Sequence, residues 1–165
     1  MIDENTETVL ASLRKVSSEE ILLVGMGNSL KADDGIGPEI CSQLKETIPD
    51  NVIDTGTVPE NYIQVIIKKA PEVILFIDAI DFGAPPGTVS VFNPSQLSDG
   101  GITTHTLSPR LLSDMITQSI PVKIYFIGIQ PKLMTIGHPM SQEVKSSEEV
   151  LVELFKHLFS LNSTI

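Results

Sequence analysis

The chain has 165 residues, of which 41% are apolar and 19% charged, with 11 lysine and arginine residues against 21 aspartate and glutamate residues. This length is typical of one domain, and the high apolar fraction excludes an intrinsically disordered chain. The net charge of −10 argues against a nucleic-acid-binding protein and against contact with an anionic membrane. A single cysteine cannot form an internal disulfide, and no apolar run is long enough to cross a bilayer. We therefore expect one soluble, cytoplasmic domain over residues 1–165.

The N-terminal part of the chain predicts a helix, a strand and a second helix. Residues 1–19 form an extension before the first strand, and residues 4–16 within it are expected to be helical. Residues 21–25 (ILLVG) are a short apolar run that ends in glycine, which is typical of an internal parallel strand. From Gly37 onward, apolar residues recur every four positions and predict a helical face. These residues are Ile40, Leu44 and Ile48.

The middle of the chain predicts a strand, a helix and two further strands. Val52 and Ile53 form a short strand, and Pro59 is well placed in the first turn of the helix that follows. The inner face of that helix is expected to contain Tyr62, Ile63, Ile66 and Ile67. Residues 73–77 (VILFI) are strongly apolar and should occupy the centre of the sheet. The ten-residue link after them is too short for a helical crossover, so residues 88–92 should form an antiparallel edge strand.

The last third of the chain continues the alternation. Residues 98–106 (SDGGITTHT) are a polar loop, and a helix is expected over 108–120 with Leu111, Leu112, Met115 and Ile116 directed inward. A central strand is expected at 123–129 and a final helix at 142–160. The apolar set of that helix is Val144, Val150, Leu151, Leu154, Phe155 and Leu158. Together these elements predict a three-layer α/β/α sandwich with a five-stranded, mostly parallel sheet and one antiparallel edge strand.

Binding sites in such sheets form outside the carboxyl ends of the strands, and a glycine-rich loop follows the first of these ends. Gly25 and Gly27 supply the G-x-G of a dinucleotide fingerprint, but Leu30 occupies the position of the third glycine. Asp54, at the end of the second strand, would suit a ribose hydroxyl. A nucleotide-binding domain is therefore kept as an alternative. A P-loop is excluded, because no Gly-Lys-Ser/Thr sequence is present.

Three further aspartates lie at strand ends or helix starts. Asp33 is expected to be a solvated residue or a helix cap. Asp34 is a candidate for chemistry, because Gly35 and Gly37 free the backbone around it and leave room for a ligand. Asp78 follows the most apolar strand, where a carboxylate is costly to bury unless it is paired, hydrogen-bonded or bound to a metal. The alternative for Asp78 is a buried aspartate that accepts hydrogen bonds from loop amides.

His105 is the third candidate, in a polar loop whose threonines could orient its ring, although a surface histidine is the alternative. Four other residues have structural interpretations: His138 in a turn, His157 near the end of the last helix, Cys41 in the core and Asp81 in a turn. No G-x-S-x-G motif or cysteine–histidine spacing supports serine or cysteine hydrolysis. Two carboxylates and one imidazole would suit a divalent metal that keeps open coordination positions.

Four segments, in chain order, together resemble the hydrogenase maturation endopeptidases, which process the large subunit of nickel–iron hydrogenases. The segments are Gly25-x-Gly27-Asn28-x-Leu30-x-x-Asp33-Asp34-Gly35-x-Gly37, Phe76-Ile77-Asp78-Ala79, Thr103-Thr104-His105 and Gly128-Ile129-Gln130-Pro131. The resemblance covers residues 20–160, and Gly-Ile-Gln-Pro together with aspartate at position 34 is most similar to the branch that serves membrane-bound, energy-converting hydrogenases. Residues 1–19 depart from the family pattern and could be a partner contact or a disordered arm.

The resemblance implies an aspartate-type endopeptidase that removes a C-terminal extension from the large-subunit precursor after nickel insertion. It places the nickel-contacting residues at Asp34, Asp78 and His105, and the catalytic residues at Asp34 and Asp78. It also implies that the nickel is supplied by the substrate. The partner would be the precursor, with no nucleic acid and no membrane, and we expect a monomer. A non-enzymatic module that checks or carries nickel through the same three residues stays open beside the nucleotide-binding alternative.

Overall fold

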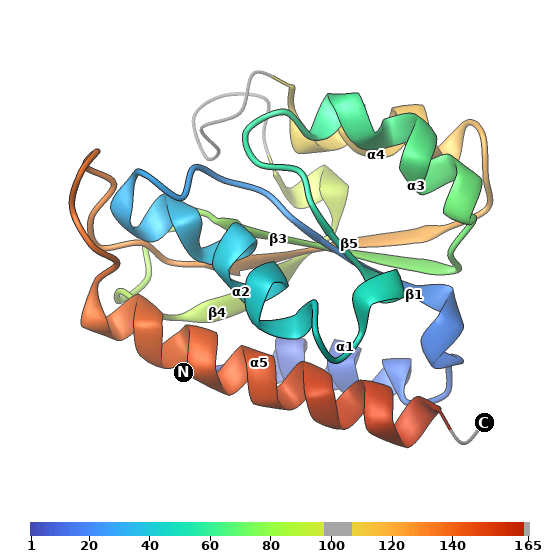
Figure 1. The fold of residues 1–165 in the computed structure, drawn as a ribbon, viewed down its shortest axis with the longest axis horizontal. Coiled ribbons are helices and arrows are strands. Elements are labelled where there is room, and N and C mark those ends of the chain that lie inside the picture. The colour runs from blue at the N-terminus through green and yellow to red at the C-terminus, as the bar shows by residue number, and fades with distance from the viewer. Residues whose placement is uncertain (98–106, 164–165) are drawn as a thin grey trace.

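The computed structural model describes residues 1–97 and 107–163. Within them, five strands form one sheet at the centre of the molecule (Figure 1). They are β1 (Ile21–Gly25), β2 (Val52–Asp54), β3 (Val73–Ala79), β4 (Val89–Phe92) and β5 (Lys123–Ile129). Their order is β2-β1-β3-β5-β4, and all neighbours are parallel except β4 and β5. The predicted central strand and the predicted antiparallel edge strand are both confirmed.

Helices cover both faces of this sheet and complete the predicted three layers (Figure 1). One face packs against α1 (Glu4–Leu13), α2 (Ile36–Leu44) and α5 (Gln142–Asn162). The other face packs against α3 (Ile63–Lys69) and α4 (Pro109–Thr117). None of the helices in the described ranges is both long enough and apolar enough to span a bilayer.

Strand β3 is buried along its whole length and contributes to both cores. Leu75 and Ile77 belong to the core on the α2 and α5 side, whereas Phe76 belongs to the core on the α3 and α4 side. This division results from the strand geometry, because successive side chains point to opposite faces. Phe76 stacks on Phe126 of β5 with a ring-centroid distance of 4.9 Å. Each such side chain stabilises the fold by about 1.5–3 kcal/mol, so the sheet is a rigid support for the loops that leave its strands.

The N-terminal extension is folded against the edge strand β4, so a disordered arm is the wrong description of residues 1–13. The Val89 N–H donates to the Met1 carbonyl at 2.9 Å, and the Asp3 N–H donates to the Val89 carbonyl at 3.3 Å. Asp3 caps α1, because its carboxylate accepts hydrogen bonds from the Thr6 backbone N–H and hydroxyl. The buried side chains of Leu10 and Leu13 then join the core beside α5.

The helices match the predicted periodicity, but two of them differ in which apolar residues face inward. Leu111 and Met115 of α4 were expected to point inward, yet 49% and 42% of their surface is exposed. Val150 of α5 is likewise 52% exposed. On α4 the buried face is a narrow stripe that comprises Pro109, Leu112, Ser113 and Ile116, and Leu111 and Met115 lie outside it. The first two helices end earlier than expected, α1 at Leu13 and α2 at Leu44, and the last continues to Asn162.

Candidate active site

Asp78 lies at the carboxyl end of the central strand, where it is fully buried. Its backbone pairs with Gly128 of β5, next to the final pair of that ladder, Ala79 with Ile129. On the other side, the chain leaving β1 continues along β3, because the Met26 N–H donates to the Ile77 carbonyl at 2.9 Å. Asp78 is therefore held near the carboxyl end of the central strand, with β5 on one side and the chain that leaves β1 on the other.

Asp34 lies in a short 3-10 turn, Ala32–Gly35, that contacts β3, and only 1% of its surface is exposed. Its Oδ2 accepts a hydrogen bond from the Asn28 backbone N–H at 3.0 Å. This bond closes the loop that follows β1 and directs one carboxylate oxygen into it. Asp34 and Asp78 thus come to the same strand ends from segments 44 positions apart in the chain.

Two glycines make this approach possible, for a reason different from the expected one. A Cβ on Gly37 would lie 2.4 Å from the Met26 carbonyl oxygen and 2.5 Å from the Ile77 carbonyl oxygen. A Cβ on Gly27, whose φ is +137°, would lie 1.9 Å from the Asp34 carbonyl oxygen. Gly37 was expected to leave room for a ligand, but it instead lets the first turn of α2 contact the ends of β1 and β3 directly.

The same crowding argues against the nucleotide-binding alternative. In a dinucleotide site, the glycines leave space for the pyrophosphate to approach the backbone and the start of the helix. Here the space beside Gly27 is filled by the Asp34 carbonyl, and Asp33 and Asp34 directly precede α2. Carboxylates at that position repel a phosphate that the helix start would otherwise attract.

Asp33 is not a solvated residue or a helix cap, so that expectation is wrong. It is fully buried, and its carboxylate accepts hydrogen bonds from the backbone N–H groups of Lys132, Leu133 and Ser141 and from the Ser141 hydroxyl. These donors come after β5, about a hundred residues further along the chain. The two neighbouring aspartates therefore have different partners, Asp33 in the loop after β5 and Asp34 in the loop after β1.

His105 falls outside the described residues, so its place beside Asp34 and Asp78 stays a prediction. Across residues 1–97 and 107–163, no three histidine, cysteine, aspartate or glutamate side chains form a metal-binding group. Of the three predicted site residues, the structure describes Asp34 and Asp78, and the turn that carries Asp34 contacts β3, the strand that carries Asp78.

The residues with structural interpretations behave as expected. Cys41 is buried, and burial is the main cause that raises the pKa of its thiol to about 12. Asp81 is a turn residue, with its Oδ1 accepting a hydrogen bond from the Gly83 N–H. His138 and His157 are both exposed.

Gln130, directly after the carboxyl end of β5, has a structural role that the sequence analysis did not predict. It is almost fully buried at the end of β5, and its Oε1 accepts hydrogen bonds from the Phe82 and Ala84 backbone N–H groups at 2.9 and 3.2 Å. Its Nε2 donates to Asp81 Oδ1 at 3.0 Å, and this bond is the main cause that lowers the pKa of Asp81. Gln130 thereby orders the loop after Asp78. A polar residue directly after a buried strand was the available signal.

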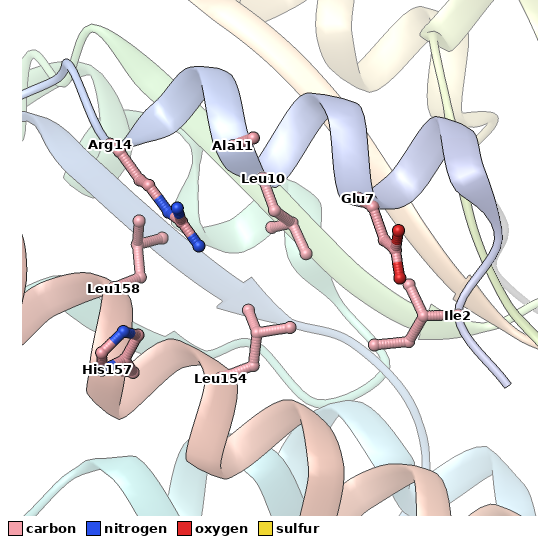
Figure 2. A pocket seen from close by; sticks show the side chains of 8 residues that line it. All are labelled: Ile2, Glu7, Leu10, Ala11, Arg14, Leu154, His157 and Leu158. Carbon is pink, nitrogen blue, oxygen red and sulfur yellow. The ribbon is translucent and has the colours of Figure 1, made fainter.

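A hollow of about 380 Å³ lies away from this edge, between α1 and α5 (Figure 2). Leu10 and Leu154 point into its middle, Glu7 lies at one end, and Arg14 and His157 lie toward the other. None of the described residues that line it stands directly after the carboxyl end of a sheet strand. This hollow is therefore separate from the candidate active site.

Comparison with known proteins supports the family resemblance. The sequence profile of HycI, described as hydrogenase maturation protease, matches residues 38–157. The chain belongs to the hydrogenase maturation protease family. The hydrogenase 3 maturation protease of Escherichia coli strain K12 is 33% identical over 135 residues, which cover 80% of this chain and 86% of that protein.

Solved structures of family members have the same fold. The crystal structure of the [NiFe] hydrogenase maturation protease HycI from Thermococcus kodakarensis KOD1 matches with a TM-score of 0.83 and 28% identity, covering 92% of this chain and 99% of that one. The solution structure of the endopeptidase HycI from Escherichia coli matches with a TM-score of 0.73 and 31% identity, covering 84% and 88%. Membership of this family makes the chain a peptidase.

Proposed function

We propose that this protease removes the C-terminal extension of a nickel–iron hydrogenase large-subunit precursor after nickel has been inserted. In this proposal Asp34, Asp78 and His105 contact the nickel ion carried by the substrate. The supporting observation is that a hydrogenase maturation protease has two buried carboxylates, Asp34 and Asp78, at the carboxyl end of its sheet. The substrate class is suggested by the name of the Escherichia coli relative, a hydrogenase 3 maturation protease.

The donor set fits a borderline divalent ion that is bound only during the reaction. Carboxylate oxygens and an imidazole nitrogen are suitable ligands for nickel, and no thiolate is among them to hold the ion firmly. Three protein ligands also leave coordination positions open. Such a site suits an ion that arrives with its own ligands on the precursor, so that only a nickel-loaded substrate completes the coordination sphere.

Two roles for the aspartates are compatible with this arrangement. The substrate nickel could polarise the scissile carbonyl or lower the pKa of a bound water, while both aspartates serve as ligands. Alternatively, one carboxylate that is not engaged with the metal acts as general base on the attacking water, as in an aspartate-type endopeptidase. We propose Asp34 and Asp78 as the catalytic pair in either case, and a membrane-bound, energy-converting hydrogenase as the enzyme served.

The decisive experiment compares apo and nickel-loaded large-subunit precursor with one preparation of the enzyme, using mass spectrometry to detect the released peptide. We expect cleavage of the loaded precursor only. Equal cleavage of both forms would contradict nickel recognition while leaving a protease. Nickel-dependent binding without cleavage would instead support the non-enzymatic nickel-checking module.

Two variants then test the metal contacts. Asp34→Asn removes a charge but keeps the size of the side chain, so cleavage of the loaded precursor should fall while the fold is retained. His105→Ala should also impair cleavage without unfolding the protein, as monitored by circular dichroism. Wild-type cleavage rates for His105→Ala would remove His105 from the site.

A further inference from the structure

The buried side chain of Asp33 holds the loop that follows β5, residues 131–141. Among the described residues, four hydrogen bonds reach its carboxylate, at distances of 2.7 to 2.9 Å, from Lys132, Leu133 and Ser141. Its own backbone N–H donates to the Leu133 carbonyl at 3.0 Å. Hydrogen bonds to a buried carboxylate are stronger than those between neutral groups, so Asp33 is a firm anchor.

A second connection joins the same two loops further from the strand ends. The Gly137 N–H donates to the Leu30 carbonyl at 2.9 Å. Leu30 and Ile136, which stand next to this bond, are 73% and 70% exposed. The loop after β1 and residues 131–141 after β5 are therefore joined at two points. Asp33 joins them near the strand ends, and the Gly137–Leu30 hydrogen bond joins them further out.

The backbone of the 3-10 turn shows why an anchor is needed there. Ala32, directly before Asp33, has φ of +48°, a left-handed conformation that residues with a Cβ disfavour. Such conformations persist only where the surrounding contacts hold them in place. The contacts made by Asp33 hold this turn, and the turn carries Asp34 on its next residue.

We propose that Asp33 is a positioning residue for peptide-bond cleavage: by fastening residues 131–141 to the turn Ala32–Gly35, it fixes the Asp34 carboxylate in its working place. Asp33 itself touches neither metal nor substrate. The inference rests on the proposed function, because it assigns Asp34 to the reaction, but the connection between the two loops can be tested without any activity.

The test uses the full-length chain with the substitution Asp33→Asn. An amide at this position presents an N–H₂ group toward backbone donors, so some of the hydrogen bonds are lost. We expect amide hydrogen exchange, measured by mass spectrometry, to accelerate in residues 132–141. With nickel-loaded precursor and enzyme in excess, the maximal cleavage rate should fall by about 10-fold or more, because small displacements of a reacting group have large effects on rate. The enzyme concentration at half-maximal rate should change much less.

Asn162→Ala is the matched control for a loss of stability alone. Asn162 is buried, and its Nδ2 donates to the carbonyls of Leu13 and Val16, before the start of β1 at the opposite edge of the sheet. This variant should lose thermal stability but keep the wild-type maximal rate and unchanged exchange in residues 132–141. A maximal rate that falls equally in both variants would reduce Asp33 to a stability role and overturn the proposal.

Ser141→Ala keeps the test decisive if Asp33→Asn does not fold. It removes the one hydroxyl donor and leaves the three backbone donors in place. A smaller increase in exchange and a smaller loss of maximal rate are expected, in the same direction. Unchanged amide exchange in residues 132–141 of both Asp33→Asn and Ser141→Ala would overturn the connection between the two loops. A wild-type enzyme that fails to cleave the loaded precursor would instead overturn the proposed function and leave the exchange result valid.

Discussion

The carboxyl ends of the strands and the β4 edge both hold remote segments against the sheet, but with different chemistry. At the carboxyl ends, the buried carboxylates of Asp33 and Asp34 accept hydrogen bonds from loop N–H groups. At the β4 edge, the N-terminal extension adds backbone pairing at Ile2 and the apolar side chains of Leu10 and Leu13, and the Asp3 carboxylate, which is bonded to β4, is partly exposed rather than buried. Burying charge is costly unless every acceptor has partners, whereas apolar burial stabilises without such a condition.

This difference indicates that the two regions serve different purposes: the first positions carboxylates, and the second stabilises the fold. At the carboxyl ends, hydrogen bonds hold buried carboxylates in defined positions, which under the proposed function serves the reaction rather than stability. The β4 edge covers backbone groups that another chain could otherwise pair with, and so contributes to stability and solubility. Removing a carboxylate charge from the first region should therefore reduce cleavage more than stability, and changes at the second region should do the reverse.

The largest effect is expected at Asp78. Asp78→Asn preserves the shape of the side chain but removes the charge, so cleavage of nickel-loaded precursor should fall by about 100-fold or more. The thermal midpoint should change little, because the amide keeps the size of the side chain and position 78 no longer requires a buried charge. The exposed residue Asp50, which precedes β2 at the opposite end of the strands, serves as control: Asp50→Asn should cleave within about 3-fold of wild type. Cleavage by Asp78→Asn at the control rate would show that the carboxyl end does not carry the chemistry.

Gly37→Ala should give the largest loss of stability. Its Cβ would meet backbone oxygens of Met26 and Ile77, which cannot move without disturbing β1 and β3. We expect the free energy of unfolding, measured with urea, to fall by about 2 kcal/mol or more. Gly56→Ala is the matched comparison, because Gly56 has φ of +55° but no atom within 4 Å of the added Cβ. Its cost should be about 1 kcal/mol, from backbone conformation alone.

Asp3→Ala tests the β4 edge. Loss of the helix cap should lower the free energy of unfolding by about 1 kcal/mol, with the cleavage rate unchanged. A pronounced loss of cleavage, at temperatures where the variant is fully folded, would contradict the division of tasks.

The contribution of Asp3 should also depend on pH. Burial alone would raise the pKa of Asp3, but hydrogen bonds from Ser90 and Thr6 outweigh it and lower the pKa below its ordinary value. A folded-state pKa below that of the unfolded chain means that the stabilisation is present above the unfolded value of 3.8 and is lost as pH falls through the folded value. The difference in stability between wild type and Asp3→Asn should therefore shrink between pH 6 and pH 2, within about 1 kcal/mol overall. A difference that grows on acidification would contradict this sign.

The last prediction concerns Cys41 of α2, whose Sγ lies 2.5 Å from where a Cβ on Gly25, the last residue of β1, would be, and no change in cleavage is needed to test it. Because burial is the main cause that raises its thiol pKa to about 12, native protein at pH 8 should react with a thiol reagent at least about 100-fold more slowly than unfolded protein. The rate is measured as mass increase. Rapid labelling of the native state would show that α2 opens from the sheet, and would weaken the picture of a rigid carboxyl end.

Much of the fold and part of the site could be predicted from the sequence, because local patterns carried the information. The apolar run at 73–77 placed β3 at the centre, and the short link after it made β4 antiparallel. Asp34 and Asp78 were assigned to the sheet edge, because each stands where a buried strand ends or a helix begins. The family resemblance added the substrate class, and it connected His105, already a candidate from its loop, with the two aspartates.

What only the tertiary structure decided are the contacts between segments far apart in the chain. Asp33 looked like a helix cap from its neighbours, yet its hydrogen-bond donors lie 99 to 108 residues away. Gly37 was expected to leave room for a ligand, but its role is to let α2 pack against the Ile77 carbonyl of β3. Leu111 and Met115 fit an apolar helical face, but the sheet reaches only part of that face. Periodicity and composition report which side chains prefer burial, whereas the partner that covers each one is determined by how the whole chain packs.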